Sequence, residues 1–399
     1  MKIKGFKFSG KACGLKKTKD PDVGLMVSAI PLRVSAVFTK NKIKAAPVLL
    51  SRANKNNIIR ALIVNSGNAN ACTGKEGMKD AKSIMRAVAG TLGVSTDNVL
   101  ICSTGVIGER LNAPLIEGAI PGMAKIARED RIPDFARSIM TTDTFPKVVK
   151  KEINISGGVK KYTIIGVAKG SGMIMPDMAT MLSFIFTDIP INAVLGDKMF
   201  RECVNSTFNS ITVDGDTSTN DTAIFFHPDE NAEDKSAYTL KNKKDKNYSI
   251  VSSALFDICS GLAAMIVKDG EGASKVVKIE VKGAYSVQGA KKVAFTVANS
   301  PLFKTMIAGE DLNWGRVMGA VGRAGARIKP EFIDIYIQGK KVVENSVSSG
   351  KISKKTENTL LSPENIRIEI DLKCGKGNYT VLTCDLTEKY IEINGSYRS

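Results

Sequence analysis

The stretch MLSFIFTD, residues 181–188, is the feature that most constrains the fold of this chain. Its apolar residues are consecutive rather than alternating, and the run is too short for a buried helix. Such a run predicts a β-strand buried on both faces. The preceding stretch AKGSGMIMPDMAT, residues 168–180, begins with lysine and glycines and predicts a loop that other groups can approach closely. Thr180 therefore lies at the mouth of a buried strand.

Strands and helices alternate around this point. We predict strands at 36–40 and 60–65, and a third that ends in the loop CSTGVIG (102–108). Apolar residues at helical spacing predict a helix over 75–93, and others are expected at 192–205, 252–272 and 284–298. Alternating strands follow in FIDIYIQ, NIRIEIDL and KYIEI. The class is α/β or α+β, and a length of 399 residues favours two units with a boundary near 180–190.

The charge of the chain is strongly basic, with 57 lysines and arginines against 40 acidic residues. The basic residues are spread along the sequence, and the densest run, KNKKDKNYS (241–249), is typical of a solvated loop. Aromatic residues do not alternate with basic ones as they do in proteins that stack bases. We therefore expect small anionic molecules as ligands rather than nucleic acid.

Compartment and metal content follow from the termini and the cysteines. No run approaches the ~18 uncharged apolar residues of a membrane helix, and the N-terminus lacks a secretory signal. The seven cysteines are scattered without a C-x-x-C pair, which argues against disulfides and against a zinc site. We predict a cytoplasmic protein with reduced thiols, no membrane contact and no metal.

Histidine occurs once, as His227 in FFHPDENAED. It stands between an apolar strand end and a Pro/Asp/Glu segment, which predicts a surface turn. A Ser-His-Asp or Cys-His system would have to use this one residue. A catalytic base other than histidine is therefore expected if the chain is an enzyme.

A threonine can be a nucleophile without histidine when its own α-amino group is the base. For Thr180 this requires cleavage of the Ala179–Thr180 bond, which the threonine hydroxyl can begin by attacking the preceding carbonyl. The small side chain of Ala179 and the glycines at 170 and 172 favour that attack. The loop CSTGVIG can supply backbone N–H groups and the Thr104 hydroxyl to the oxyanion that forms.

Several motifs together resemble the glutamate N-acetyltransferase family of arginine biosynthesis, also called ornithine acetyltransferases. They are AKGSGMIMPDMATML, NSGNANACTG, CSTGVIG, TTDTFPK, VKDGEGASK, GEDLNWGR and the terminal INGSYRS. The resemblance runs from VFTKNKIKAAPV to the last residue. Asp177 departs from the family pattern, in which a neutral residue is frequent, while Pro176 and the residues at the cleavage site agree with it.

The resemblance implies a two-domain α/β fold of the ArgJ-like (DmpA/ArgJ) type, different from the usual four-layer fold of N-terminal nucleophile hydrolases. It implies self-cleavage into an α chain, 1–179, with the oxyanion loop, and a β chain, 180–399, that begins with the nucleophile. Two chains of each kind would form a heterotetramer. Thr180 would take acetyl from N2-acetylornithine and pass it to glutamate in a ping-pong reaction without a cofactor.

The resemblance also implies a role for each site residue. Thr180 would be the nucleophile, and Thr104 and Gly105 would form the oxyanion hole. The substrate contacts would be Thr141 or its neighbour Thr142, Lys169, Thr180, Glu271, Asn394 and Ser399. Lys169 and Glu271 suit substrates that carry both carboxylate and ammonium groups.

Three alternatives stay open from the sequence. Acetyl-CoA can be a second acetyl donor in a bifunctional enzyme, or N-acetylornithine can be the single donor. A self-processing amidase or aminopeptidase would use the same nucleophile with water as the acyl acceptor. A basic nucleic-acid-binding module is the non-enzymatic alternative, which the dispersed lysines disfavour.

Overall fold

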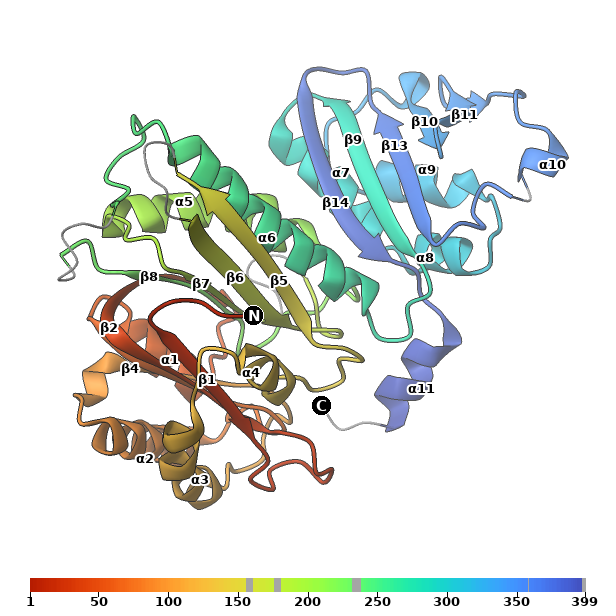
Figure 1. The fold of residues 1–399 in the computed structure, drawn as a ribbon. Coiled ribbons are helices and arrows are strands. Elements are labelled where there is room, and N and C mark those ends of the chain that lie inside the picture. The colour runs from red at the N-terminus through yellow and green to blue at the C-terminus, as the bar shows by residue number, and fades with distance from the viewer. Residues whose placement is uncertain (156–160, 176–180, 232–237, 358, 397–399) are drawn as a thin grey trace.

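The computed structural model describes residues 1–155, 161–175, 181–231, 238–357 and 359–396. These residues build two β-sheets with their helices (Figure 1). The larger sheet has eight strands in the order β4-β3-β2-β8-β7-β6-β5, and β1 pairs with β2 beside this path. Its strands are β1 Phe6–Lys11, β2 Val23–Phe38, β3 Ile59–Asn65, β4 Val99–Ser103, β5 Lys147–Asn154, β6 Lys161–Lys169, β7 Leu182–Thr187 and β8 Thr222–Pro228.

Strand β7 confirms the prediction of a strand buried on both faces. All six of its residues are buried. Phe184 and Phe186 belong to a core with β1 and the helix α4 (Ile132–Ser138), while Ile185 belongs to a core on the opposite face. Successive side chains of a strand point to opposite faces, so an uninterrupted apolar run is what a doubly covered strand requires.

The predicted division at 179/180 falls inside the larger sheet. Strand β6 precedes it and β7 follows it, and the two pair antiparallel from Lys169↔Leu182 to Ile164↔Thr187. Cleavage at this point would leave both products joined by one sheet. The division into residues 1–179 and 180–399 stays a prediction about processing, and the change from one sheet to the other lies further along the chain, between α6 and β9.

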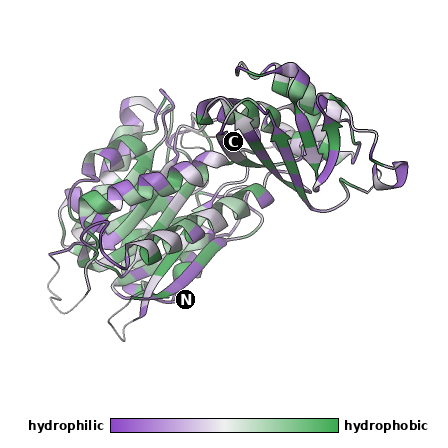
Figure 2. Cartoon of the chain, turned by 90° about the horizontal axis from the view of Figure 1, so that it is seen from above, coloured by the Kyte–Doolittle hydropathy of each residue, from purple (hydrophilic) through white to green (hydrophobic). Residues whose placement is uncertain are grey.

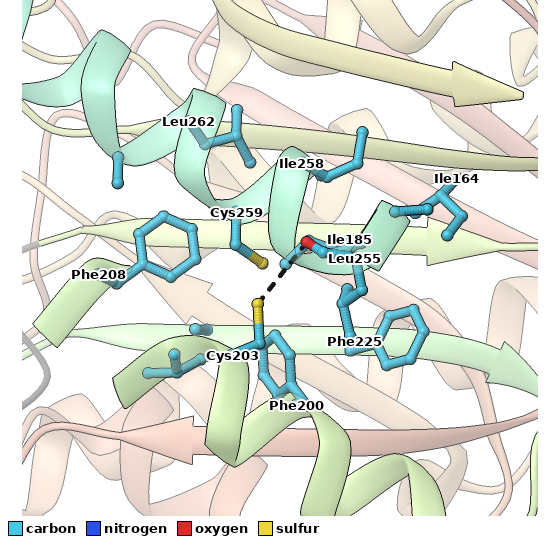
Figure 3. Packing of buried hydrophobic residues seen from close by; sticks show 14 of the residues in the cluster. Ile164, Ile185, Phe200, Cys203, Phe208, Phe225, Leu255, Ile258, Cys259 and Leu262 are labelled. Carbon is cyan, nitrogen blue, oxygen red and sulfur yellow. Dashed lines mark hydrogen bonds between the residues drawn. The ribbon is translucent and has the colours of Figure 1, made fainter. Parts of the chain in front are cut away.

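Helices α5 (Ala193–Ser206) and α6 (Tyr248–Lys268) pack over one face of this sheet. Figure 3 shows the contact, with Phe200, Phe208 and Phe225 around two buried thiols. Cys203 Sγ donates to the carbonyl oxygen of Leu255 at 3.6 Å. Helix α6 is long and apolar enough to cross a membrane, but half of its most apolar 18-residue segment is buried inside the protein. Packing in the core therefore explains its apolar composition. The remaining helices beside this sheet are α1 Ala46–Asn54, α2 Gly74–Leu92 and α3 Ala113–Ile126.

The smaller sheet has the order β12-β11-β10-β13-β9-β14. One face packs on helices α7 (Val287–Ala298), α8 (Pro301–Ala308) and α9 (Trp314–Gly322) in a single apolar core. In Figure 2 the strands of the smaller sheet show both green and purple, because buried apolar residues alternate with exposed charged ones along β9 and β13. The strands are β9 Val276–Ala284, β10 Asp334–Ile337, β11 Lys340–Glu344, β12 Val347–Ser348, β13 Asn365–Asp371 and β14 Gly377–Cys384, with the short helix α10 Lys354–Glu357 near them.

The predicted strand KYIEI is wrong, because these residues lie in the C-terminal helix α11, Glu388–Ser396. No residue of α11 is buried, and the helix lies beside the gap between the two sheets (Figure 1). Tyr390 and Asn394 are four residues apart and lie on one face of the helix, where Asn394 Nδ2 donates to the carbonyl oxygen of Tyr390 at 3.0 Å. Five residues with alternating hydrophobicity also fit a helix with one polar face.

The surface turn predicted for His227 is also wrong. Strand β8 continues through this residue, which pairs with Arg33 of β2, and the side chain is 0% exposed. Helix α5 covers it at Gly196, where a methyl group would lie 2.9 Å from His227 Nε2. The strand extends through Pro228, and the turn follows only at Glu230.

Candidate active site

The described candidate residues gather around one cavity. It encloses about 110 Å³ and lies where β4 and β6 end, beside the residues that follow α6 and beside α11. Its walls include all of the proposed site residues that the structure describes: Thr104, Gly105, Thr141, Thr142, Lys169, Glu271 and Asn394. Residues separated by up to 290 positions in the chain thus meet in one cavity. Ala179, Thr180 and Ser399 lie outside the described residues.

The predicted oxyanion loop has a fixed backbone. The N–H of Thr104 donates to the carbonyl oxygen of Asn65 at 2.9 Å, whereas its hydroxyl lies 3.4 Å from Nζ of Lys169, another residue of the cavity wall. Gly105 has a φ of +131°, and a Cβ there would lie 2.3 Å from the backbone carbon of Gly67. Glycine is therefore required by the backbone angle and by close packing. Its N–H has no acceptor among the described residues and is available to an oxyanion.

Asn220, which also lines the cavity, holds the start of this loop in place. Its side-chain amide donates to the carbonyl oxygens of Ala69 and Ser103, at 2.6 and 2.8 Å. Thr219 donates to the amide oxygen of Asn220 at 2.6 Å. Asn220 was not predicted from the sequence, in which it lies within a long polar stretch, NSTFNSITVDGDTSTNDTA, without a motif that marks it.

Lys169 was predicted in a loop, but it is the last residue of β6 and is only 4% exposed. Its Nζ lies 3.4 Å from Thr104 Oγ1 and 4.0 Å from Asp143 Oδ2. Burial lowers the pKa of Lys169, and the Asp143 carboxylate opposes that effect. The ammonium group thus faces the cavity beside the oxyanion loop.

A buried ion cluster lies beneath Lys169. Lys147 Nζ lies 2.7 Å from Asp143 Oδ1 and 2.5 Å from Asp269 Oδ2, and all three side chains are at most 2% exposed. Burial alone would raise the pKa of Asp143, but Lys169 and Lys147 outweigh it and hold that pKa at about 2. Asp143 also accepts the N–H groups of Thr141 and Gly170, at 2.9 and 2.7 Å, and so fixes the segments on either side of the cavity.

The segment 141–142 contributes two neighbouring hydroxyl groups. Both Thr141 and Thr142 line the cavity, and both are partly exposed. The Thr142 hydroxyl lies 3.0 Å from the Ser171 hydroxyl, whereas Thr141 is held through its backbone N–H by Asp143. The Thr142 side chain therefore already has a partner, and Thr141 stays the prediction for a substrate contact.

Glu271 and Asn394 join the two units at the cavity. Asn394 Nδ2 donates to Glu271 Oε2 at 2.9 Å, and Tyr390 of the same helix lines the cavity beside them. Gly172 lies under the carboxylate, where a Cβ would be 2.3 Å from Glu271 Oε2. The lack of a side chain at Gly172 lets the Glu271 carboxylate lie over the loop. The wall of the cavity thus carries a negative charge at Glu271 and a positive charge at Lys169.

Residues 7–399 match the model of the ArgJ family. The arginine biosynthesis bifunctional protein ArgJ of Geobacter sulfurreducens is 42% identical over 400 residues and is covered completely, as is this chain. The protein of the same name from Brucella melitensis is 43% identical over 398 residues, which are 100% of this chain and 96% of that protein.

A solved structure agrees with these relatives. The arginine biosynthesis bifunctional protein argJ of Bacillus halodurans is 36% identical with a TM-score of 0.51, and covers 55% of this chain and 100% of its own. The expected α/β fold of the ArgJ-like type is confirmed, and so is the resemblance found in the motifs. This chain belongs to the ArgJ family.

Proposed function

We propose that this chain is an acetyltransferase of arginine biosynthesis that moves an acetyl group from N2-acetylornithine to glutamate. The products are ornithine and N-acetylglutamate. One observation carries the proposal: seven residues with roles in acetyl transfer by resemblance line one small cavity beside the start of β7. A set assembled by chance from motifs along 399 residues would not be expected to converge in this way.

The first step is processing of the chain. The Thr180 hydroxyl attacks the Ala179 carbonyl carbon, the acyl group moves from nitrogen to oxygen, and water hydrolyses the ester. Ala179 then ends in a carboxylate and Thr180 begins with a free α-amine. The B. halodurans chain matches over its whole length yet spans 55% of this chain, which is the share that residues 180–399 represent. This agreement supports cleavage before Thr180.

Acetyl transfer then needs no histidine. The α-amine takes the hydroxyl proton as Thr180 attacks the acetyl carbonyl, and the proton passes to the departing amine of ornithine. The Gly105 N–H and the Thr104 hydroxyl would stabilise the oxyanion, an effect worth about 3–4 kcal/mol for each such donor. Glutamate then attacks the acetyl ester with its amine and regenerates the threonine.

The charges on the cavity walls fit amino-acid substrates. Both substrates carry a carboxylate near the reacting nitrogen, and Lys169 offers a buried ammonium group for it. Glu271 offers a carboxylate for an ammonium group, with Asn394 fixing its orientation. Ser399 is proposed as a further contact by resemblance. The active form would be a cytoplasmic heterotetramer of two α and two β chains.

A second acetyl donor also has an observation in its favour. A larger cavity of about 810 Å³ adjoins the site and shares Thr141 with it. Its wall carries the basic residues Lys16, Lys17 and Arg137 beside the acidic residues Asp20, Glu109 and Asp143. The cavity thus offers room for a larger donor such as acetyl-CoA and three basic side chains for its phosphate groups.

The test is glutamate acetylation by the purified protein with each donor given separately. N-acetylornithine should support turnover, and Thr180→Ala should abolish it because no hydroxyl remains. Release of acetate at the same rate with and without glutamate would instead favour the amidase alternative. Acetylation from acetyl-CoA alone would show the bifunctional form, and its absence would restrict the enzyme to acetyl recycling.

A further inference from the structure

Asp221 is a buried carboxyl group that the proposed mechanism does not use. It immediately precedes β8 and is 1% exposed. Its Oδ1 accepts the N–H of Met181 at 2.9 Å, and the next residue, Thr222, donates its N–H to the Met181 carbonyl oxygen at 3.1 Å. Both backbone groups of Met181 are therefore held by this pair of residues. Met181 is bonded directly to Thr180, the proposed nucleophile.

The second oxygen of Asp221, Oδ2, is buried and has no hydrogen-bond partner among the described residues. No described lysine or arginine forms an ion pair with this carboxyl. Lys169, at the end of β6, is the charged group that interacts electrostatically with the Asp221 carboxyl, and Met181 and Ser218 contribute backbone N–H groups to it. Burial raises the pKa of Asp221 well above its ordinary value, because a charged carboxylate is poorly solvated there, so a cation beside it would be stabilised.

Cleavage before Thr180 changes what lies next to this carboxyl. Standard bond lengths keep the α-nitrogen of any residue within about 3.7 Å of the next amide nitrogen. Asp221 Oδ1 lies 2.9 Å from the Met181 nitrogen, so the α-nitrogen of Thr180, one residue earlier, is no more than about 7 Å from Oδ1. Asp221 Oδ2 can lie nearer to it. Hydrolysis turns that nitrogen from a neutral amide into an amine that can carry a positive charge.

We propose that Asp221 is a positioning residue built to pair with the α-amine that cleavage releases. Oδ1 keeps its bond to the Met181 N–H, and Oδ2 accepts a hydrogen bond from the new amine, so that a carboxylate and an ammonium group form a pair. Any proton that the carboxyl carries before cleavage passes to the amine in forming this pair. During acetyl transfer the carboxylate holds the amine in line with the Thr180 hydroxyl and stabilises the ammonium formed when the hydroxyl loses its proton.

This inference rests on the proposed function, and it predicts a specific change in pH dependence. The amine must be neutral to accept the hydroxyl proton, so kcat/KM for acetyl transfer should rise with pH through the pKa of the amine. A nearby carboxylate raises that pKa. Asp221→Asn keeps an oxygen for the Met181 N–H but removes the anion, so the rise should move to lower pH by about one pH unit or more.

The experiment compares wild type, Asp221→Asn and the control Asp334→Asn. Asp334 is as deeply buried, at 2% exposed, but it lies in the smaller sheet and pairs with Lys341 and Lys373. We expect Asp334→Asn to lose stability and to keep the wild-type pH profile. A second readout needs no turnover: the pH dependence of α-amine labelling by acetic anhydride, followed by mass spectrometry on the peptide that begins at Thr180.

Two results would overturn the inference. Asp221→Asn with a pH profile equal to that of the wild type would show that no ion pair forms. Asp221→Asn that stays uncut would show that the carboxyl acts before an amine exists, which contradicts a role as its partner. Failure of the proposed function is seen separately, as a wild-type protein that does not begin a chain at Thr180 or does not transfer acetyl.

Discussion

Replacing Gly105 by alanine should displace the oxyanion loop and leave the other residues of the site in place. The added Cβ would lie 2.3 Å from the backbone carbon of Gly67 and 2.5 Å from the backbone nitrogen of Asn68. Neither atom belongs to a flexible side chain, so the loop itself must move. Gly105 also has a φ of +131°, which an alanine does not adopt without strain.

The magnitude follows from these two effects. Crowding in a packed region costs about 1–3 kcal/mol, and the unfavourable backbone angle adds about 1–2 kcal/mol. A displaced oxyanion donor lowers turnover by roughly 10²–10³-fold, as complete removal of a donor does. We therefore expect a free energy of unfolding lower by about 2–5 kcal/mol and a kcat lower by at least ~10²-fold at equal amounts of folded enzyme.

Gly108→Ala is the matched control in the same loop. Gly108 has a φ of +84°, but a Cβ there would meet no atom within 4 Å. It should lose the conformational part, about 1–2 kcal/mol, and keep wild-type turnover. Urea unfolding and steady-state acetyl transfer measure the two quantities. Gly105→Ala with the turnover of Gly108→Ala would refute the role of this loop.

Three further predictions concern the tail, the ion cluster and the histidine. Asn394→Ala should lower kcat/KM about 10- to 100-fold by freeing the Glu271 carboxylate, with self-cleavage intact, whereas Ile391→Ala on the exposed side of the same helix should change neither. The pKa of Asp143, about 2, is below its ordinary value, so the contribution of its carboxylate to the stability of the fold is complete above about pH 4 and is lost as pH falls toward 2. In Asp143→Asn that part of the pH dependence of thermal unfolding should be absent, and an unchanged profile would refute this role. Burial lowers the pKa of His227 to about 4, so between about pH 6.5 and 4 the unfolded chain binds a proton that the folded one does not, and stability falls as pH drops through that window. His227→Gln should flatten this slope and keep turnover, whereas a large loss of turnover would indicate that the histidine is catalytic.

Much of the fold could be predicted from local patterns. The continuous apolar run at 181–188 predicted β7, and helical spacing predicted α2, α6 and α7, because burial on one or both faces dictates those patterns directly. The prediction for KYIEI was wrong because five residues cannot distinguish a period of two from a helix whose exposed face is mixed. The prediction for His227 was wrong because covering by α5 is a tertiary contact that no local pattern records.

The site was predictable in part. Lys169 and Glu271 were identified by resemblance, and nothing local would have brought them together across one cavity. The ion cluster beneath them was missed because Lys147 and Asp269 are 122 residues apart in the sequence. Asp221 was missed for a similar reason, since its bond to Met181 depends on the pairing of β7 with β8.

The account depends most directly on an acetyl group carried by Thr180. The measurement is the mass of the proteolytic peptide that begins at Thr180, taken after brief exposure of wild-type protein to N-acetylornithine without glutamate. The account predicts one added acetyl group on this peptide, located on the threonine hydroxyl and removed when glutamate is added. Acetyl on a lysine or cysteine instead, or an intact and fully active chain with no such peptide terminus, would contradict it.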